Sequence, residues 1–274
     1  MPRRFTQVDV FTDRLGYGNP LAVVLDGEGL ADESLAVFAR WTNLSETTFV
    51  LPPLDPAADY RVRIFTPSEE LPFAGHPTIG TCHAWLEAGG TPKTPGVIVQ
   101  ECGVGLVELR QSGDALRFAT PPLMRSGPVD AHDLAHAADA LGLAPDEILD
   151  SAWIDNGPGW LGIRIGTTER LAELAPNLDP ADKYGVVALT GGDDPALVVR
   201  AFFHADGTRE DPVTGSLNGS VAQWLLGNAT ITAPYRSSQG TAIGRDGRIE
   251  ISEADGEIWV GGSAVTGITG TVDL

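Results

Sequence analysis

The pattern of apolar and polar positions along the chain predicts many short strands and few helices. Alternating or β-branched runs predict strands at residues 5–11, 22–25, 48–51, 60–65, 97–100, 105–109, 116–118, 162–165, 186–189, 198–203 and 249–251. Apolar residues three and four positions apart predict helices at residues 31–42, 78–87, 131–141, 168–174 and 216–226. The 33 glycines and 20 prolines are spread along the whole chain, as tight turns between short strands require.

Short motifs recur at a nearly constant spacing, which predicts two similar halves. The spacing is 137 to 140 residues, close to half of the 274-residue chain, in the pairs Arg63 and Arg200, Pro72 and Pro212, Gly75 and Gly215, Asn19 and Gly157, and Trp85 and Trp224. The proline-rich stretch 119–123 is the best linker candidate. We therefore expect an N-terminal lobe over residues 1–120 and a C-terminal lobe over 121–274, with the last strand free to return to the first lobe.

Composition and charge narrow the class of partner. With 42% apolar residues the chain can form a sizeable core, and its net charge of −19 disfavours nucleic acid and anionic membranes as partners. No run approaches 18 apolar residues, and no apolar segment of a signal peptide follows Arg3 and Arg4. Cys82 and Cys102 lack metal or redox spacing. These features predict a cytoplasmic protein with free thiols.

Glu46 is the first candidate for chemistry. It lies in the stretch Asn-Leu-Ser-Glu-Thr, which we expect to connect a helix ending near Thr42 to a strand starting near Thr48. Apolar neighbours would desolvate the carboxylate partly, which raises a pKa towards that of a working base. The matching place in the second half, near Tyr184, is not acidic. A solvated turn residue is the alternative, but the asymmetry favours a single base.

Both halves place a glycine-containing turn before a helix, and a helix N-terminus attracts negative charge. In the first half the turn contains Gly75 and His76, and an imidazole there is expected to be neutral near pH 7 and to donate a hydrogen bond. In the second half Asp211 precedes the turn, and Ser216 is expected to cap the helix. Facing each other, two such termini would hold a carboxylate without a metal.

Two other interpretations of these residue types are weaker. Ser216, His76 and Asp211 have the composition of a hydrolase triad, but the chain contains no Gly-x-Ser-x-Gly elbow. His132 and His136 have a spacing that suits a metal, but no third ligand is evident in the sequence. We therefore predict neither a metal nor any other cofactor.

At these residues the sequence resembles the PhzF family of phenazine-biosynthesis-like isomerases. The shared stretches occur in the family's order and span most of the chain: 18–23, 43–47, 64–67, 70–77 and 210–216. The resemblance implies an α+β, diaminopimelate epimerase-like fold with two pseudo-symmetric lobes. Each lobe would be a curved, mostly antiparallel sheet around a central helix. The resemblance also implies a homodimer.

The resemblance further implies roles for individual residues. Glu46 is similar to the family's catalytic acid/base, and His76, Asp211 and Ser216 are similar to its other active-site residues. Neighbours in the same motifs are expected to contact the substrate: Asn19, Ser45, Gly75, Thr214 and Gly215. The namesake reaction isomerises trans-2,3-dihydro-3-hydroxyanthranilate without a cofactor.

One departure from the wider superfamily bears on the reaction type. The resemblance to the wider superfamily would imply a two-thiol epimerase, with a cysteine near each glycine turn. This chain has no cysteine at either turn, and Cys82 is expected to lie in the core. The sequence therefore predicts an isomerase that moves a proton between carbons of a small amino or hydroxy carboxylate in a biosynthetic pathway. An epimerase with a second base that is not a thiol, and a binding protein without activity, are the alternatives.

Overall fold

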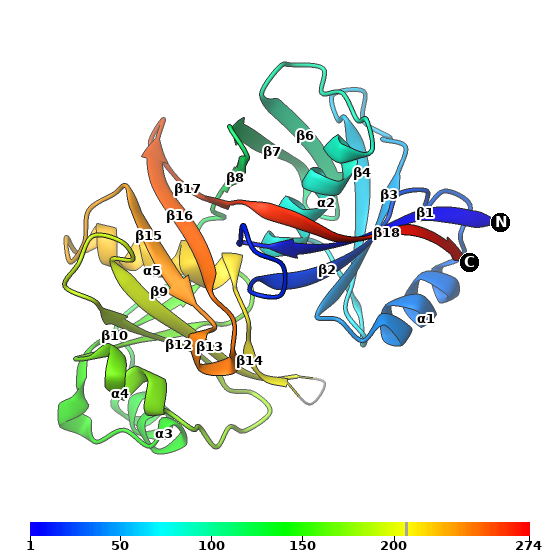
Figure 1. Ribbon diagram of the computed structural model, residues 1–274. Coiled ribbons are helices and arrows are strands. Elements are labelled where there is room, and N and C mark those ends of the chain that lie inside the picture. The colour runs from blue at the N-terminus through cyan, green and yellow to red at the C-terminus, as the bar shows by residue number, and fades with distance from the viewer. Residues whose placement is uncertain (206–207) are drawn as a thin grey trace. The chain divides into compact units, whose positions relative to one another are not determined.

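The computed structural model describes residues 1–205 and 208–274, and these form two compact units (Figure 1). Unit 1 comprises Met1–Ala119 and Gly261–Leu274, and unit 2 comprises Thr120–Val260. The C-terminal strand therefore belongs to the same unit as the N-terminus. The two ends of the chain lie side by side, with Pro2 opposite Asp273 in the sheet.

Unit 1 is one mixed sheet in the order β18–β1–β2–β3–β4–β6–β7–β8, with the short β5 added to β4. The β2/β3 and β4/β6 pairs are parallel and the others are antiparallel. Its elements are β1 (Pro2–Val10), β2 (Asn19–Val24), α1 (Asp32–Thr42), β3 (Glu46–Leu51), β4 (Tyr60–Phe65), β5 (Glu70–Leu71), α2 (Gly75–Glu87), β6 (Val97–Cys102), β7 (Gly105–Ser112), β8 (Ala115–Ala119) and β18 (Ala264–Asp273).

Unit 2 repeats this plan in the order β9–β10–β11–β12–β13–β15–β16, with β14 added to β13. Here the parallel pairs are β11/β12 and β13/β15. Its elements are β9 (Arg125–Gly127), α3 (Ala131–Leu141), the 3₁₀ turn Pro145–Glu147, β10 (Ile148–Asp155), β11 (Leu161–Ile165), α4 (Thr168–Glu173), β12 (Lys183–Leu189), β13 (Leu197–Ala205), β14 (Thr208–Asp211), α5 (Gly215–Gly227), β15 (Tyr235–Gln239), the 3₁₀ turn Thr241–Ile243, β16 (Gly247–Ala254) and β17 (Glu257–Gly262).

The internal repeat predicted from the sequence extends to side-chain contacts. In unit 1 the Arg63 guanidinium forms two parallel bonds of 2.7 Å to Glu70. In unit 2 Arg200 binds Glu210 with the same fork geometry, at 3.0 and 2.6 Å. Each arginine also lies over a phenylalanine two residues further on. Shared topology together with a shared ion pair is what duplication of one ancestral unit would leave.

Each unit has a central helix that is buried along most of its length. Nine residues of α2 and nine of α5 are buried, so these helices are covered on most sides, unlike amphipathic surface helices. Glycine allows the close packing: a Cβ at Gly80 would approach the side chains of Leu21 and Val10 to 2.7 Å. A Cβ at Gly219 would lie 2.3 Å from the Thr120 hydroxyl. The packing fixes where each helix begins, and therefore where its N-terminal groups point.

The predicted elements agree with the structure for the long periodic segments, and differ at the starts of both central helices, at Glu46, at Ser216 and in several strands. Both central helices begin earlier than predicted, at Gly75 and Gly215, so both glycine turns belong to the helices. The expectation that Glu46 lies in a connection before the strand is wrong, because Glu46 is the first residue of β3. Ser216 does not cap α5, since the N-cap is Thr214. For β18 only the existence of a last strand was predicted, without bounds, and β5, β9, β10, β14, β15 and β17 were not predicted.

Candidate active site

Glu46 is positioned by the end of α1 and the start of β3. Asn43 ends the helix in the left-handed conformation, with φ of 54°. The hydroxyls of Thr42 and Thr47 then bond each other at 2.7 Å across the connection. Glu46 lies between these two threonines in the sequence and is aligned with Leu21 on the parallel neighbour β2. Its side chain is only 15% exposed. The carboxylate is therefore held at a strand start and largely shielded from water.

The partner of Glu46 in unit 1 is His76, in the first turn of α2. Its Nε2 lies 3.3 Å from Glu46 Oε2. Burial lowers the pKa of His76 to about 3, so the ring is neutral at physiological pH. The neutral state was predicted from the helix N-terminus, but desolvation is its cause here. The structure thus brings together two residues that the sequence had assigned to one site.

The hydrogen bonds of His76 determine which ring nitrogen carries the proton. Asn19, fully buried at the start of β2, places its Nδ2 donor 3.3 Å from His76 Nδ1. An amide nitrogen only donates, so Nδ1 must accept, and the single proton of the neutral ring is then on Nε2. Nε2, which lies 3.3 Å from Glu46 Oε2, is thus the nitrogen that carries the proton. Asn19, predicted as a substrate contact, acts in this structure as the residue that orients His76.

The start of α2 adds backbone donors beside these side chains. Ala74 is the N-cap and provides no side-chain cap, and the first intrahelical bond is made by the Thr78 N–H to the Ala74 carbonyl at 3.1 Å. The N–H groups of Gly75 and His76 precede that bond, as the first donors of any helix do. Ser45 is half-buried and immediately precedes Glu46. The predicted residues of unit 1 thus lie in two short segments, Ser45–Glu46 and Gly75–His76, and Asn19 contacts His76.

In unit 2 the corresponding residues surround the start of α5. Asp211 ends β14 and is buried, and its Oδ2 accepts a hydrogen bond from the Thr214 hydroxyl. Thr214 is the N-cap of α5 without a side-chain cap bond, and the Asn218 N–H makes the first intrahelical bond to its carbonyl at 3.1 Å. Gly215 and Ser216 follow in the first turn. The structure therefore gathers Asp211, Thr214, Gly215 and Ser216 at one helix end.

Two further residues, Trp160 and Asn156, contact this helix end. The indole N–H of Trp160 donates to the Ser216 hydroxyl oxygen at 3.2 Å, so the proton of that hydroxyl can be donated elsewhere. The Nδ2 of Asn156 donates to the Ser216 carbonyl at 3.0 Å. Asn156 is spaced 137 residues from Asn19, as Arg200 is from Arg63, and each asparagine contacts the second residue of its central helix. A repeat alignment at that spacing would have found it.

Strand register also refines the comparison between the halves. Phe49 is paired with Arg63 in unit 1, and Val186 is paired with Arg200 in unit 2. This places Lys183, rather than Tyr184, at the position equivalent to Glu46. The equivalent residue is thus basic, and the asymmetry that singled out Glu46 holds.

Cys82 is buried in α2, and burial raises its pKa to about 12, which fits the predicted core role.

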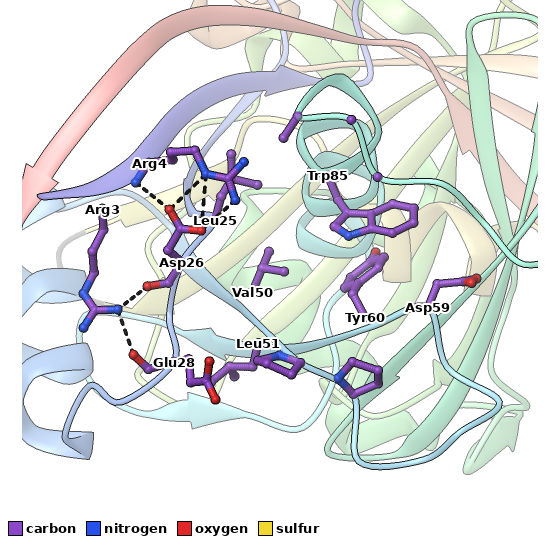
Figure 2. A pocket seen from close by; sticks show the side chains of 15 residues that line it. Arg3, Arg4, Leu25, Asp26, Glu28, Val50, Leu51, Asp59, Tyr60 and Trp85 are labelled. Carbon is purple, nitrogen blue, oxygen red and sulfur yellow. Dashed lines mark hydrogen bonds and ion pairs between the residues drawn. The ribbon is translucent and has the colours of Figure 1, made fainter.

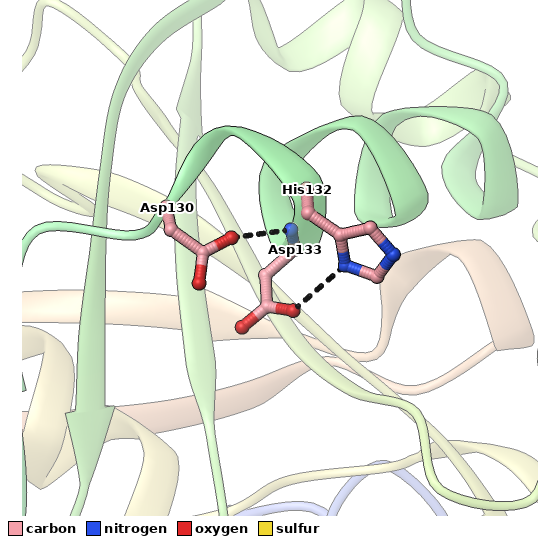
Figure 3. Close-up of side chains that lie close together, drawn as sticks. All are labelled: Asp130, His132 and Asp133. Atoms are coloured by element: carbon pink, nitrogen blue, oxygen red, sulfur yellow. Dashed lines mark hydrogen bonds and ion pairs between the residues drawn. The ribbon is translucent and has the colours of Figure 1, made fainter.

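Two groups of acidic and histidine side chains lie away from these residues. Asp130, His132 and Asp133 cluster at the start of α3 (Figure 3), where the Asp130 carboxylate caps the helix by accepting from the Asp133 N–H at 2.8 Å. The second group contains His136, Asp179 and Asp182. The two histidines therefore belong to separate clusters, and carboxylates from distant segments join His136. The spacing of His132 and His136 therefore does not reflect a shared metal site among the described residues.

A hollow of about 520 Å³ lies elsewhere in unit 1 (Figure 2). One side is formed by Arg3, which donates to the carbonyls of Asp26 and Glu28, and by Arg4, which pairs with the Asp26 carboxylate at 2.6 Å. The lining does not include Glu46, His76 or the start of α2. This hollow is therefore separate from the candidate catalytic residues.

The comparisons with known proteins identify the family. The model of the phenazine biosynthesis-like protein family (PhzC-PhzF) matches residues 8–270. The chain belongs to this family. It is 31% identical to a trans-2,3-dihydro-3-hydroxyanthranilate isomerase of Pseudomonas fluorescens, over 97% of this chain and 98% of the relative. It is 32% identical to the enzyme of the same name from Pseudomonas aeruginosa, over 90% of this chain and 88% of the relative.

A solved structure supports the same fold. The PhzF-family protein of Bacillus anthracis superposes with a TM-score of 0.84 at 23% identity, and each chain is covered completely. The predicted α+β, diaminopimelate epimerase-like fold is thus confirmed, and the chain is an isomerase of the PhzF-like family. Among the described residues, no helix is both long and apolar enough to cross a membrane.

Proposed function

We propose that this PhzF-like isomerase moves a proton from one carbon to another in a small amino or hydroxy carboxylate, with Glu46 as the single acid/base. The observation that carries the proposal is the shielded Glu46 carboxylate 3.3 Å from a neutral imidazole. The compound named for two relatives, trans-2,3-dihydro-3-hydroxyanthranilate, is the first substrate to test.

In the proposed reaction the Glu46 carboxylate removes a proton from an activated carbon, and the electron pair of that C–H bond delocalises towards the substrate carboxylate. The protonated Glu46 then returns the proton to a different carbon, so the double bonds shift and no atom is gained or lost. The neutral His76 would support both steps, because its Nε2–H can donate a hydrogen bond to the substrate while the ring carries no positive charge. Proton removal from an activated carbon requires only a base, and we propose that no cofactor takes part.

The starts of α2 and α5 are proposed to bind the substrate carboxylate and the charge that develops on it. Backbone N–H groups at a helix start stabilise negative charge without reorganising during the reaction. In unit 2 the Ser216 hydroxyl and the Asp211 carboxylate would orient the polar groups of the substrate. That the residues of the two units act on one substrate stays a prediction of the sequence, as do the homodimer and the cytoplasmic location.

The test replaces Glu46 with glutamine, which keeps the shape of the side chain and removes the base. Isomerisation of trans-2,3-dihydro-3-hydroxyanthranilate is followed by absorbance for the wild type, Glu46→Gln and the control Glu69→Gln, whose carboxylate is exposed in the same unit. Loss of a positioned acid/base lowers kcat by about 10²–10⁴ or more. We expect that loss for Glu46→Gln and a rate within threefold of wild type for Glu69→Gln. A near-wild-type rate for Glu46→Gln would remove Glu46 from the mechanism.

The epimerase alternative makes a different product. An epimerase inverts one carbon and needs a base on each side of it, whereas the residue equivalent to Glu46 in unit 2 is Lys183. Chiral chromatography of the product, together with its absorbance spectrum, distinguishes the two reactions. A product with the original double bonds and an inverted centre would favour the epimerase.

A further inference from the structure

A buried glutamine connects the residues at the start of α5. Gln239, the last residue of β15, is fully buried. Its Nε2 donates to the Asp211 carbonyl at 3.1 Å and to the Thr214 hydroxyl oxygen at 2.9 Å. Its Oε1 accepts from the Thr214 N–H at 3.0 Å and from Asn218 Nδ2 at 2.8 Å. One side chain therefore holds the end of β14, the N-cap and the first turn of the helix.

These hydrogen bonds fix the donor and acceptor roles of the Gln239 amide, the Asn218 amide and the Thr214 hydroxyl. The Ser237 hydroxyl donates to Asn218 Oδ1, so the Asn218 amide nitrogen is turned towards Gln239 Oε1. Gln239 consequently directs its own N–H groups at Thr214 and Asp211. The Thr214 oxygen accepts one of them, and its only proton is donated to Asp211 Oδ2. Gln239 and Thr214 thus form one chain of hydrogen bonds that ends on the Asp211 carboxylate.

Unit 1 contains the same glutamine in a different role. Gln100 on β6 is also fully buried, accepts from the Tyr60 hydroxyl at 3.0 Å and donates to the Thr78 hydroxyl at 3.1 Å. The residue that corresponds to Asp211 in the repeat is Leu71, at the end of β5. The glutamine is therefore common to both units, and in unit 2 it is linked through the Thr214 hydroxyl to a carboxylate.

We propose that Gln239 is a positioning residue, which acts through Thr214 to hold the Asp211 carboxylate in the orientation that the substrate needs. This inference rests on the proposed function, in which Asp211 orients the substrate. A hydrogen-bonded support of this kind matters because a displacement of about 1 Å at a reacting centre can cost about 10²-fold in rate. Without Gln239 the Thr214 hydroxyl oxygen would lose the donor that directs its proton to Asp211 Oδ2.

The activity test uses Gln239→Leu, with Gln100→Leu as the matched control. Both variants remove a fully buried glutamine amide, so both are expected to lower the melting temperature. We expect Gln239→Leu to lower kcat/KM by about 10²-fold and Gln100→Leu to stay within threefold of wild type. Equal losses in the two variants would reduce Gln239 to a purely structural residue and overturn the proposal.

A double-mutant cycle tests the route through Thr214. Thr214→Val removes the hydroxyl with little change of shape and is the smaller perturbation if Gln239→Leu fails to fold. If Gln239 acts through Thr214, the double variant loses no more activity than the stronger single variant, because both changes break one chain of bonds. Multiplicative losses would contradict the proposed route.

A measurement without substrate separates this inference from the proposed function. The Thr214 amide proton, bonded to Gln239, should exchange slowly with D₂O in the wild type and at least tenfold faster in Gln239→Leu, as followed by ¹H–¹⁵N NMR. If the wild type does not isomerise trans-2,3-dihydro-3-hydroxyanthranilate while this change in exchange is seen, the proposed substrate fails and the positioning contact stands. Unchanged exchange at Thr214 would overturn the positioning role itself.

Discussion

The two arginine–glutamate pairs offer a comparison within one molecule, because the geometry is the same and the burial differs. Arg200 and Glu210 have side chains that are each 8% exposed. Arg63 and Glu70 are 25% and 41% exposed. The perturbation is a neutral, nearly isosteric replacement of the acid in each unit, Glu210→Gln and Glu70→Gln. Glu210 immediately precedes Asp211, so the unit 2 pair also anchors the strand end that carries a candidate site residue.

The expected magnitudes follow from burial. In Glu210→Gln the Arg200 charge stays in the interior, where its Nη1 is held by the carbonyls of Leu171 and Leu174 at 2.8 and 2.9 Å. Removing one partner of a buried ion pair costs about 3–5 kcal/mol, because the other charge is left without compensation. In Glu70→Gln the partner Arg63 keeps Asp32 at 2.6 Å, and a pair this exposed contributes about 0.2–1 kcal/mol.

The assay is urea unfolding followed by circular dichroism, at 0.1 M and 1 M NaCl, for the wild type and both variants. We expect a free-energy difference of several kcal/mol between the two variants. The small effect of Glu70→Gln should fade at 1 M NaCl, where the screening length falls to about 3 Å, and the large effect of Glu210→Gln should persist. Similar costs for the two variants, or a Glu210→Gln effect that salt abolishes, would refute the reasoning from burial.

Two pH effects follow from the histidines. Because burial lowers the pKa of His76 from 6.5 to about 3, the unfolded chain binds a proton in that window and the native chain does not. The wild type should therefore lose about 1.4 kcal/mol of stability per pH unit on acidification from 6.5 towards 3, and His76→Asn should lack this component in urea titrations across that range. At His136 the hydrogen bond to Asp182 raises the pKa above 6.5, so its stabilising effect is complete below pH 6.5 and disappears as the pH rises through the native pKa. The Tm difference between wild type and His136→Gln should thus be larger at pH 6 than at pH 9, and an equal difference at both would contradict the assignment.

The parts of the fold that the sequence predicts well are those with a strong local pattern. The helix over 131–141 and the strand over 60–65 have the predicted bounds. The strand β10 was missed, and β18 was expected without bounds, for local reasons: β10 mixes acidic with apolar residues, and β18 is rich in glycine and threonine. Both are strands because neighbouring strands pair with them, and that information lies far away in the sequence.

The candidate site also contains some residues that a local pattern predicts and some contacts that it does not. The glycine turns, His76 and Asp211 were found from motifs because a helix start has a local signature. The contact between Glu46 and His76 depends on the parallel register of β2 with β3 and on the packing of α2, which no local pattern contains. Asn156 was missed because the repeat was predicted to pair Asn19 with Gly157, which is one residue further along the chain.

In the proposed reaction one group, Glu46, carries the proton between two carbons. The most direct test is a substrate deuterated at the carbon that loses its proton, converted in H₂O and followed by NMR of the product. A single shielded carboxylate predicts that part of the deuterium appears at the newly protonated carbon in the wild type, and that Glu46→Gln gives no conversion. Conversion by Glu46→Gln at the wild-type rate, with all of the deuterium lost to solvent, would contradict the account.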